Sequence, residues 1–150
     1  MPLSFTSWGL GYDLPDPATT AIRERTTAPA PDCAYITTPV AVNTWSAWTE
    51  WIAALPAKSW LASVYHGINA PAASGTYCIE VGIGAAGSEV TIVRMSGAVF
   101  CATAVGYAYM VGQTLGTPIA LPSATRIAVR VSANVASRQV YHSIQWYQTV

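Results

Sequence analysis

From about residue 44 onward, short apolar runs alternate with turn residues, and this spacing limits the possible folds more than any other feature. The runs are rich in Val, Ile, Tyr and Trp, which favour strands, while Gly, Pro, Asn and Ser interrupt them roughly every 8 to 12 residues. Short strands at such regular intervals are typical of a β-sandwich or barrel. We therefore expect an all-β fold.

Alternation predicts which side of each strand faces the core. Successive side chains of a strand point to opposite faces, so residues two apart share a face. The inward sets predicted in this way are Trp60, Ala62, Val64, His66 and Ile68; Tyr77, Ile79, Val81 and Ile83; Ile127, Val129 and Val131; and Val140, His142, Ile144 and Trp146. The third set alternates with Arg126 and Arg130, which places two arginines on the polar face of that strand.

One segment fits two kinds of secondary structure. Trp45, Trp48, Ile52 and Leu55 would form one stripe of a helix that Thr44 could cap, and the same residues tolerate a strand. We favour the strand, because everything that follows is strand-like.

The first 40 residues differ in composition from the rest. Six of the ten prolines lie here, mixed with Thr and Ala, and apolar periodicity is absent. We predict an extended arm over residues 1–40 and a single sandwich over 41–150. Because Phe5, Trp8, Tyr12 and Leu14 are large apolar groups that a disordered linker rarely carries, we expect the arm to lie against something.

Gly82, Gly84 and Gly87 have the G-x-G-x-x-G spacing of dinucleotide-binding loops, but their surroundings argue against a cofactor. Such a loop must open a helix, whereas the β-branched run from Val90 to Val93 favours a strand. No Asp or Glu follows Glu89 to bind a ribose. We predict a connection between antiparallel strands, in which glycines adopt positive φ, and no cofactor.

Other residues of chemical interest give no catalytic or metal-binding pattern. His66 and His142 lie on predicted strands without identifiable partners, and four of the seven acidic residues fall in the Pro-rich arm, a poor platform for paired carboxylates. Cys33, Cys78 and Cys101 are widely spaced and suggest free thiols, although their bonding state stays open. We expect no enzyme and no metal site.

Charge and hydropathy narrow the possible partners. Only 9% of residues are charged against 52% apolar, and the seven basic residues include a single lysine, Lys58, without any basic tract. Nucleic acid is therefore not expected as a partner, and the absence of a run of about 18 apolar residues excludes a membrane-spanning helix. So little charge suggests that other subunits cover part of the apolar surface.

The aromatic residues allow two interpretations. Six tryptophans and eight tyrosines could stack on the sugar rings of a glycan. Because Trp60 and Trp146 occupy inward positions and Trp45, Trp48 and Trp51 cluster in one segment, we favour core or subunit interface.

Three segments resemble a group of tailed-bacteriophage virion proteins: WTEWI at 48–52, IEVGIGAAGSE at 79–89 and PIALPSATRIAVR at 118–130. The resemblance extends over about two thirds of the chain and implies an antiparallel jelly-roll-like β-sandwich without enzymatic activity. This chain differs from the family's pattern at Glu80, where an Asp is expected, and its Pro-rich start has no counterpart in the family.

The resemblance implies a function in assembly. Such proteins decorate capsids or form modules of head, tail and baseplate fibres, commonly as homotrimers. We expect a capsid decoration (cement) protein of the virion, assembled in the host cytoplasm, that binds copies of itself and the major capsid protein or another virion protein. The alternative is a tail or fibre module that binds a host glycan or surface receptor.

Two expectations concern the surfaces used in assembly. The interface candidates are Phe5, Trp8, Tyr12, Leu14, Arg126 and Arg130. Deletion of residues 1–40 is expected to abolish attachment and to leave the sandwich folded.

Overall fold

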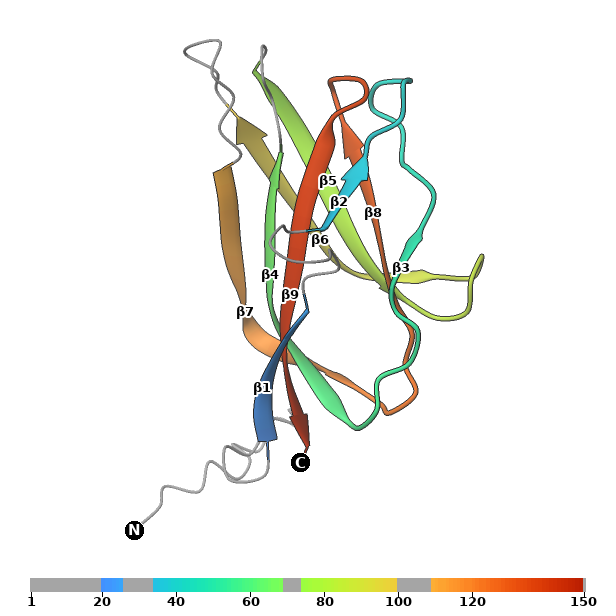
Figure 1. Ribbon diagram of the computed structural model, residues 1–150, viewed down its shortest axis with the longest axis vertical. Coiled ribbons are helices and arrows are strands. Elements are labelled where there is room, and N and C mark those ends of the chain that lie inside the picture. The colour runs from blue at the N-terminus through green and yellow to red at the C-terminus, as the bar shows by residue number, and fades with distance from the viewer. Residues whose placement is uncertain (1–19, 26–33, 69–73, 100–108, 150) are drawn as a thin grey trace.

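The computed structural model describes residues 20–25, 34–68, 74–99 and 109–149 (Figure 1), and these ranges contain nine strands and no helix. The all-β prediction is confirmed. The strands are β1 (Thr20–Arg25), β2 (Ala34–Thr37), β3 (Thr49–Ile52), β4 (Ser59–Ile68), β5 (Gly75–Ile83), β6 (Val90–Val99), β7 (Tyr109–Leu121), β8 (Ile127–Ala133) and β9 (Gln139–Thr149).

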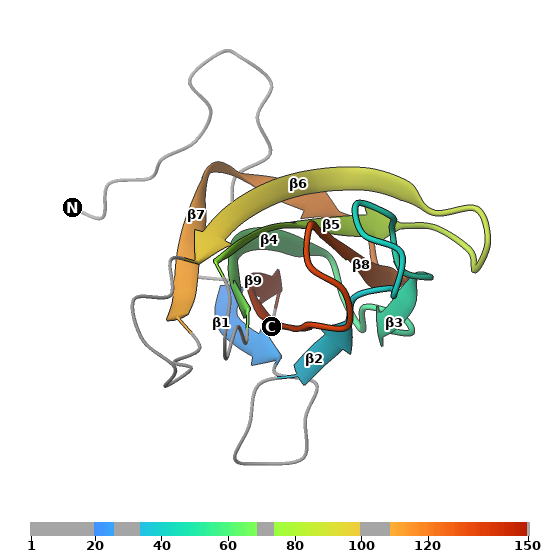
Figure 2. The same ribbon diagram turned by 90° about the horizontal axis from the view of Figure 1, so that it is seen from above.

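The strands form two antiparallel sheets packed face to face. Sheet A has the order β1-β9-β4-β7, with β2 also paired to β9, and sheet B has the order β3-β8-β5-β6. From above, β5 and β6 lie on one side of the sandwich and β1, β2 and β9 on the other (Figure 2). The chain crosses from one sheet to the other between β3 and β4, between β4 and β5, and at each of the three steps from β6 to β9. The architecture is therefore a jelly-roll-like sandwich, as expected.

Two strands come from the segment predicted as an arm. β1 pairs with the C-terminal half of β9, with Thr20 opposite Thr149, and β2 continues along the same edge, with Tyr35 opposite Tyr141. Both strands satisfy backbone donors and acceptors that β9 would otherwise expose. The sandwich therefore begins before residue 41, and the boundary predicted there is corrected; residues 1–19 and 26–33 lie outside the described ranges.

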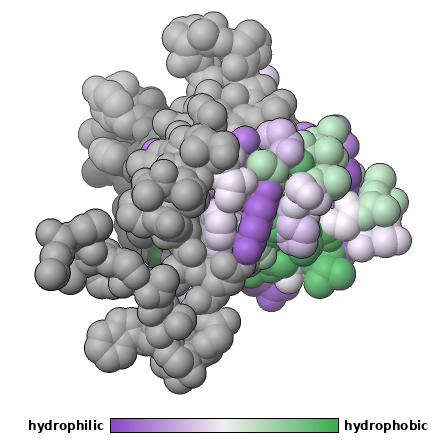
Figure 3. Space-filling view, turned by 90° about the horizontal axis from the view of Figure 1, so that it is seen from below, coloured by the Kyte–Doolittle hydropathy of each residue, from purple (hydrophilic) through white to green (hydrophobic). Residues whose placement is uncertain are grey.

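The core lies between the sheets and confirms the alternation predicted for β8 and β9. Ile127, Val129 and Val131 are fully buried, as are Val140 and Ile144. Both sheets contribute further apolar side chains, among them Leu61, Val64 and Leu121 from sheet A and Ile79 and Val81 from sheet B. Large apolar groups do reach the surface, as at Tyr35, Val40, Val42 and Val90, and the view from below shows hydrophobic beside hydrophilic residues (Figure 3).

A bulge in β4 breaks the predicted alternation. The pairing of β4 with both neighbours shifts between Leu61 and Ser63, so Ala62 is an extra residue. Leu61 therefore faces the core, whereas Trp60 lies opposite Tyr147, outside the core cluster. The prediction that Trp60 shares the face of Val64 is wrong, because a bulge changes which side each later residue occupies, although Trp60 is buried, with 4% of its surface exposed.

The glycine-rich segment is the turn between β5 and β6, as predicted. It projects beyond the body of the sandwich (Figure 1), and its glycines adopt positive φ, 121° at Gly84 and 81° at Gly87. Gly82 has a different role, since a Cβ there would lie 2.6 Å from the Trp48 ring. The dinucleotide-like spacing thus combines two turn glycines with one glycine that makes room for an aromatic ring.

The ambiguous segment contains a short strand. β3 covers Thr49 to Ile52 and pairs with β8, which confirms the choice of strand there, while residues 44–48 belong to no strand. Trp51, Ile52 and Leu55 are buried in the core, and Trp45 and Trp48 remain partly exposed.

We predict that two deletions separate the arm from the sandwich. Removing residues 1–19 keeps β1 and β2 and gives the reference stability. Removing residues 1–37 should cost more than about 2 kcal/mol, since it takes Ile36 from the core and exposes the edge of β9. Urea unfolding followed by tryptophan fluorescence measures both, and equal stability of the two variants would contradict the assignment of β1 and β2 to the sandwich.

Candidate functional site

The outer face of sheet B carries a buried carboxylate held by two arginines. Glu80 on β5 lies between Arg94 on β6 and Arg130 on β8 in the strand register, and its side chain has no exposed surface. Arg94 Nε donates to Oε1 at 2.5 Å, and Arg130 Nε donates to Oε2 at 2.6 Å. Thr91 adds a third hydrogen bond, from its hydroxyl to Oε2 at 3.2 Å.

Two tryptophans cover these arginines from outside. The Arg130 guanidinium carbon lies 4.9 Å from the Trp45 ring centre and 4.5 Å from that of Trp48, and the Arg94 carbon lies 5.6 Å from Trp45. Such cation–π contacts stabilise each pair by roughly 0.5 to 2 kcal/mol. Trp45 and Trp48 therefore cover Arg130, and Trp45 also lies beside Arg94, whose side chain remains 64% exposed.

The environment of Glu80 sets its charge. Burial alone would raise the pKa of Glu80, but the hydrogen bonds and positive charges of Arg130 and Arg94 outweigh burial and lower the pKa from its usual 4.5. Glu80 therefore stabilises the fold at neutral pH. This contribution is present above pH 4.5 and is lost as the pH falls through the lowered value.

A second ion-pair group lies at the glycine-turn end of sheet B. Arg126 donates through Nε to Glu50 and through Nη1 to Glu89, each at 2.9 Å, and also to the Gly84 carbonyl at 3.2 Å. Burial alone would raise the pKa of Glu89, and hydrogen bonds from backbone amides and from Arg126 more than compensate and lower it. Arg126 thus ties the turn to β3.

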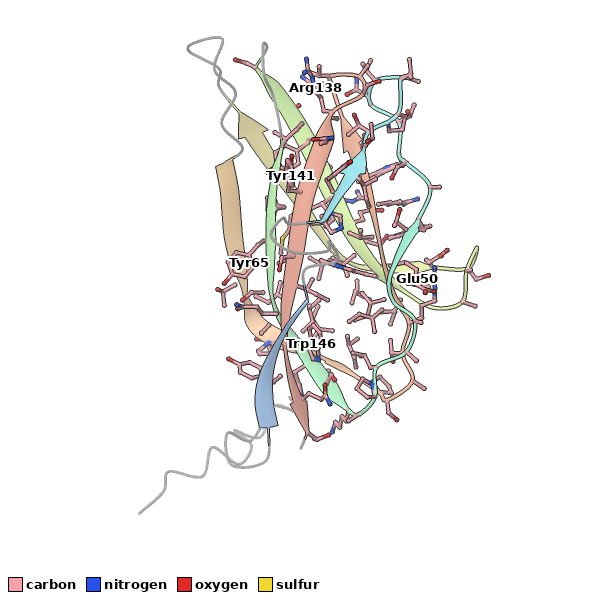
Figure 4. All side chains as sticks on the ribbon, viewed as in Figure 1. Glu50, Tyr65, Arg138, Tyr141 and Trp146 are labelled. Atoms are coloured by element: carbon pink, nitrogen blue, oxygen red, sulfur yellow. The ribbon has the colours of Figure 1, made fainter. Side chains whose placement is uncertain are left out.

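Sheet A carries its charged residues on one strand only, the edge strand β1, which contains Arg23, Glu24 and Arg25. β2, β4, β7 and β9 contain no Asp, Glu, Lys or Arg. The outer sides of β2, β4 and β9, which we call the tyrosine face, carry Tyr35, Tyr65, Tyr141, Gln145 and Tyr147. Tyr35 and Tyr141 meet edge to face at 5.8 Å, and the Tyr65 hydroxyl donates to Gln145 Oε1 at 3.2 Å. In Figure 4, Tyr65 lies on the opposite side of the molecule from Glu50.

A shallow groove opens beside the tyrosine face where β4 and β7 lose register. The pairing of β4 with β7 moves from Ser63–Thr114 to Leu61–Ile119. Ala62 on β4 is therefore the single residue opposite residues 115–118 of β7. The groove is lined by Ala62, Ser63, Thr114, Leu115, Pro118, Gln145, Trp146 and Tyr147. All of these side chains are neutral, and several can form hydrogen bonds.

The histidines lie inside the sandwich. His66 and His142 are neighbours across β4 and β9, and both are buried. His66 Nδ1 is hydrogen-bonded to the Tyr77 hydroxyl at 2.8 Å, and His142 packs edge-on against Trp51 with ring centres 4.8 Å apart. Burial is the largest effect on the pKa values of His66, His142 and Tyr77. It lowers the pKa of His66, lowers that of His142 to about 4 and raises that of Tyr77 to about 12.

The structure describes two of the six predicted interface residues, Arg126 and Arg130. Phe5, Trp8, Tyr12 and Leu14 fall outside the described ranges. Arg126 and Arg130 lie on β8 or just before it, but on sheet B and in ion pairs within the chain. Their use at an interface stays a prediction.

Several further expectations concern possible ligands and thiols. Within the described ranges, no group of three His, Cys, Asp or Glu side chains could hold a metal ion, and no helix is long and apolar enough to cross a membrane. Cys78 is a free, half-buried thiol. Cys33 and Cys101 lie outside those ranges.

Sequence reasoning missed the partners of Glu80 and the cover of Trp45 and Trp48. In the structure, Glu80 and Glu89 are each paired with an arginine. Counting outward from the glycine turn would have placed Glu80 close to Arg94. The sequence around Arg130 does not indicate its contacts with Trp45 and Trp48, because these residues are far apart in the chain.

Comparisons with known proteins add little. No family model matches the chain, and no curated protein matches it. Among solved structures, the structure of Eiger TNF from S. frugiperda aligns over 91% of this chain and 88% of that chain, with 10% sequence identity and a TM-score of 0.40.

Glu80 provides a test of the sheet B cluster. We predict that Glu80→Gln lowers the free energy of unfolding by about 2 to 3 kcal/mol, because a neutral amide cannot balance two guanidinium groups at a buried position. The matched control is Glu50→Gln, whose side chain is 52% exposed and should cost less than about 1 kcal/mol. Urea unfolding at pH 7 measures the stability of both variants. Equal losses of unfolding free energy would contradict the prediction that the buried Glu80 stabilises the fold more than the exposed Glu50.

Proposed function

We propose that the chain is a non-enzymatic structural protein of a tailed-bacteriophage particle, a capsid decoration (cement) protein whose copies associate through the tyrosine face as a homotrimer. The phage assignment is supported by the sequence segments at 48–52, 79–89 and 118–130. The association is supported by the structure of sheet A.

The observation that carries the proposed association is the absence of charged residues from β2, β4, β7 and β9, whereas the charged residues of sheet A all lie on its edge strand β1. On sheet B, Glu50, Glu80 and Glu89 are each paired with arginine, and Trp45 and Trp48 cover part of the outer face. The tyrosine face carries no charged residue of its own strands, and the charged groups nearest to it are Lys58, 5.1 Å from the Trp60 ring, and Glu24, opposite Gln145 in the register of β1 and β9. Interface cores are enriched in tyrosine and depleted in charged residues, so this face has the composition of a subunit contact.

Permanent assembly fits this composition. A contact that forms once does not need the charged rim that keeps a transient surface soluble, and obligate interfaces are more apolar than transient ones. Many identical contacts around a shell would add their binding energies and stabilise it without any chemical reaction.

One substitution at this face tests association. We predict that Tyr65→Lys weakens self-association at least tenfold, because the new charge must lose water inside the contact. Tyr65→Phe keeps the ring and should retain association, and Val90→Lys places the same charge at a 64% exposed position of sheet B and should have no effect. Sedimentation velocity measures all three; a monomeric wild-type chain at high concentration, or equal effects of the two lysines, would contradict the proposal.

The alternative function, a tail or fibre module that binds a host glycan, is favoured by the groove beside Ala62. Ser63, Thr114 and Gln145 offer neutral hydrogen-bonding groups, and Tyr147 offers a ring next to them. Neutral donors and acceptors beside an aromatic ring are suited to a sugar, which is itself uncharged and rich in hydroxyls.

Locating the chain on the particle separates the two functions. We predict that gold-labelled antibodies against the chain decorate the capsid shell of the phage that encodes it. Labelling confined to the tail tip would contradict the decoration role and support the fibre module. In that case, a glycan array should detect binding that Gln145→Ala abolishes.

A further inference from the structure

His66 and His142 form a polar pair at the centre of sheet A. They are directly opposite one another on β4 and β9, with 0% and 2% of their surfaces exposed. A buried imidazole is usual only when its ring nitrogens are satisfied or neutral. The described core around this pair consists otherwise of aliphatic and aromatic side chains, with Val64, Ile68, Val140 and Ile144 on the same two strands.

The contacts of both rings suit the neutral imidazole. His142 Nδ1 donates to the Val140 carbonyl at 3.3 Å, and the ring lies edge-on to Trp51. His66 Nδ1 is bonded to the Tyr77 hydroxyl, while its Nε2 is buried with no hydrogen-bond partner among the described residues. In the protonated ring both nitrogens carry a hydrogen, so Nε2 would be a donor, and the ring a charge, where no described group can accept either.

No described acidic group faces the pair from any neighbouring element. From sheet B, the facing groups are Tyr77 of β5 and Trp51 of β3, while Glu50, Glu80, Arg94 and Arg130 belong to the ion-pair groups on the outer side.

On the neighbouring strands of sheet A, the one described acid is Glu24 of β1, and the register places it opposite Gln145 of the tyrosine face rather than opposite the histidines. Tyr35 of β2 meets Tyr141 on the outer side of the sheet. On β7, Val111 lies opposite His66. The charged residues of β1 are Arg23, Glu24 and Arg25, and the nearest by register, Arg25, lies opposite Ile144, two residues from His142 along β9.

We propose that the His66–His142 pair makes sheet A acid-sensitive: protonation of either ring is incompatible with its buried position, so mildly acidic pH opens the sandwich and releases the subunits. The release of subunits rests on the proposed association through the tyrosine face. That face is built on the same strands, with Tyr65 adjacent to His66 and Tyr141 adjacent to His142.

The direction of the effect follows from the lowered pKa values. Both imidazoles are harder to protonate in the folded chain than in the unfolded chain, where the pKa is about 6.5. The unfolded state therefore binds more protons as the pH falls, and stability that is fully present above pH 6.5 is lost below it, for His142 down to about pH 4. Between pH 7.5 and 5.0, His142 should reduce the folded-to-unfolded ratio about thirtyfold, and His66 should add to this.

The composition of the chain isolates this effect. His66 and His142 are the only histidines among its 150 residues, so imidazole titration has no other source. Glu80 and Glu89 have pKa values lowered below 4.5, so their contributions are lost only at more acidic pH.

The test compares the full-length wild-type chain with His142→Phe at pH 7.5 and pH 5.0. Phenylalanine keeps an aromatic ring against Trp51 and cannot be protonated. We expect the wild-type urea midpoint and its association to fall sharply at pH 5.0, and the folded-to-unfolded ratio of His142→Phe to fall about thirtyfold less. Equal losses in the two proteins would overturn the assignment to His142.

A second measurement on the wild-type chain holds even if the variant fails to fold. Imidazole NMR signals should stay neutral in the folded chain and change only together with loss of the fold. Titration of both rings near pH 6.5 with fold and association intact would overturn the proposal. A chain that is monomeric at pH 7.5 would contradict the proposed function, while its urea midpoints would still test the histidines.

Discussion

The ladder between β4 and β9 is the interaction on which the other features depend. β9 is paired on one side with β4 and on the other with β1 and β2, so it is the only strand in the described part that holds three others. The register of this ladder places His66 and His142 inside and Tyr65 outside. A shift by one residue would exchange these two faces, so the core and the tyrosine face are fixed by the same set of hydrogen bonds.

The outer surfaces of the two sheets differ in their charged residues. Sheet B needs its charges compensated because Glu80 is fully buried, and compensation comes from Arg94 and Arg130 together with the tryptophans that cover them. Sheet A carries no such charges on β2, β4, β7 or β9. One outer surface is thus partly covered within the chain, and the other includes the tyrosine face, through which we propose that copies associate.

The sequence was sufficient for features that depend on neighbours along the chain. The alternation from Val140 to Trp146 and the positive φ of Gly84 and Gly87 both follow from local rules of strand and turn geometry. The bulge at Ala62 was not predictable in this way, because an inserted residue is identified only by the register of the strands beside it.

Long-range contacts explain the remaining differences. β1 and β2 were not recognised as strands, since their pairing partner, β9, lies at the other end of the chain. The cover of Trp45 and Trp48 over Arg130 likewise joins distant segments. The candidate site was therefore less predictable than the fold class, because it consists almost entirely of such contacts.

Hydroxyl-radical labelling of the full-length chain above and below its association concentration tests the central claim most directly. If copies meet through the tyrosine face, labelling of Tyr65 and Tyr141 should fall several-fold on association, while labelling of Val90, 64% exposed on sheet B, should not change. Association that leaves Tyr65 and Tyr141 as reactive as before would contradict the account.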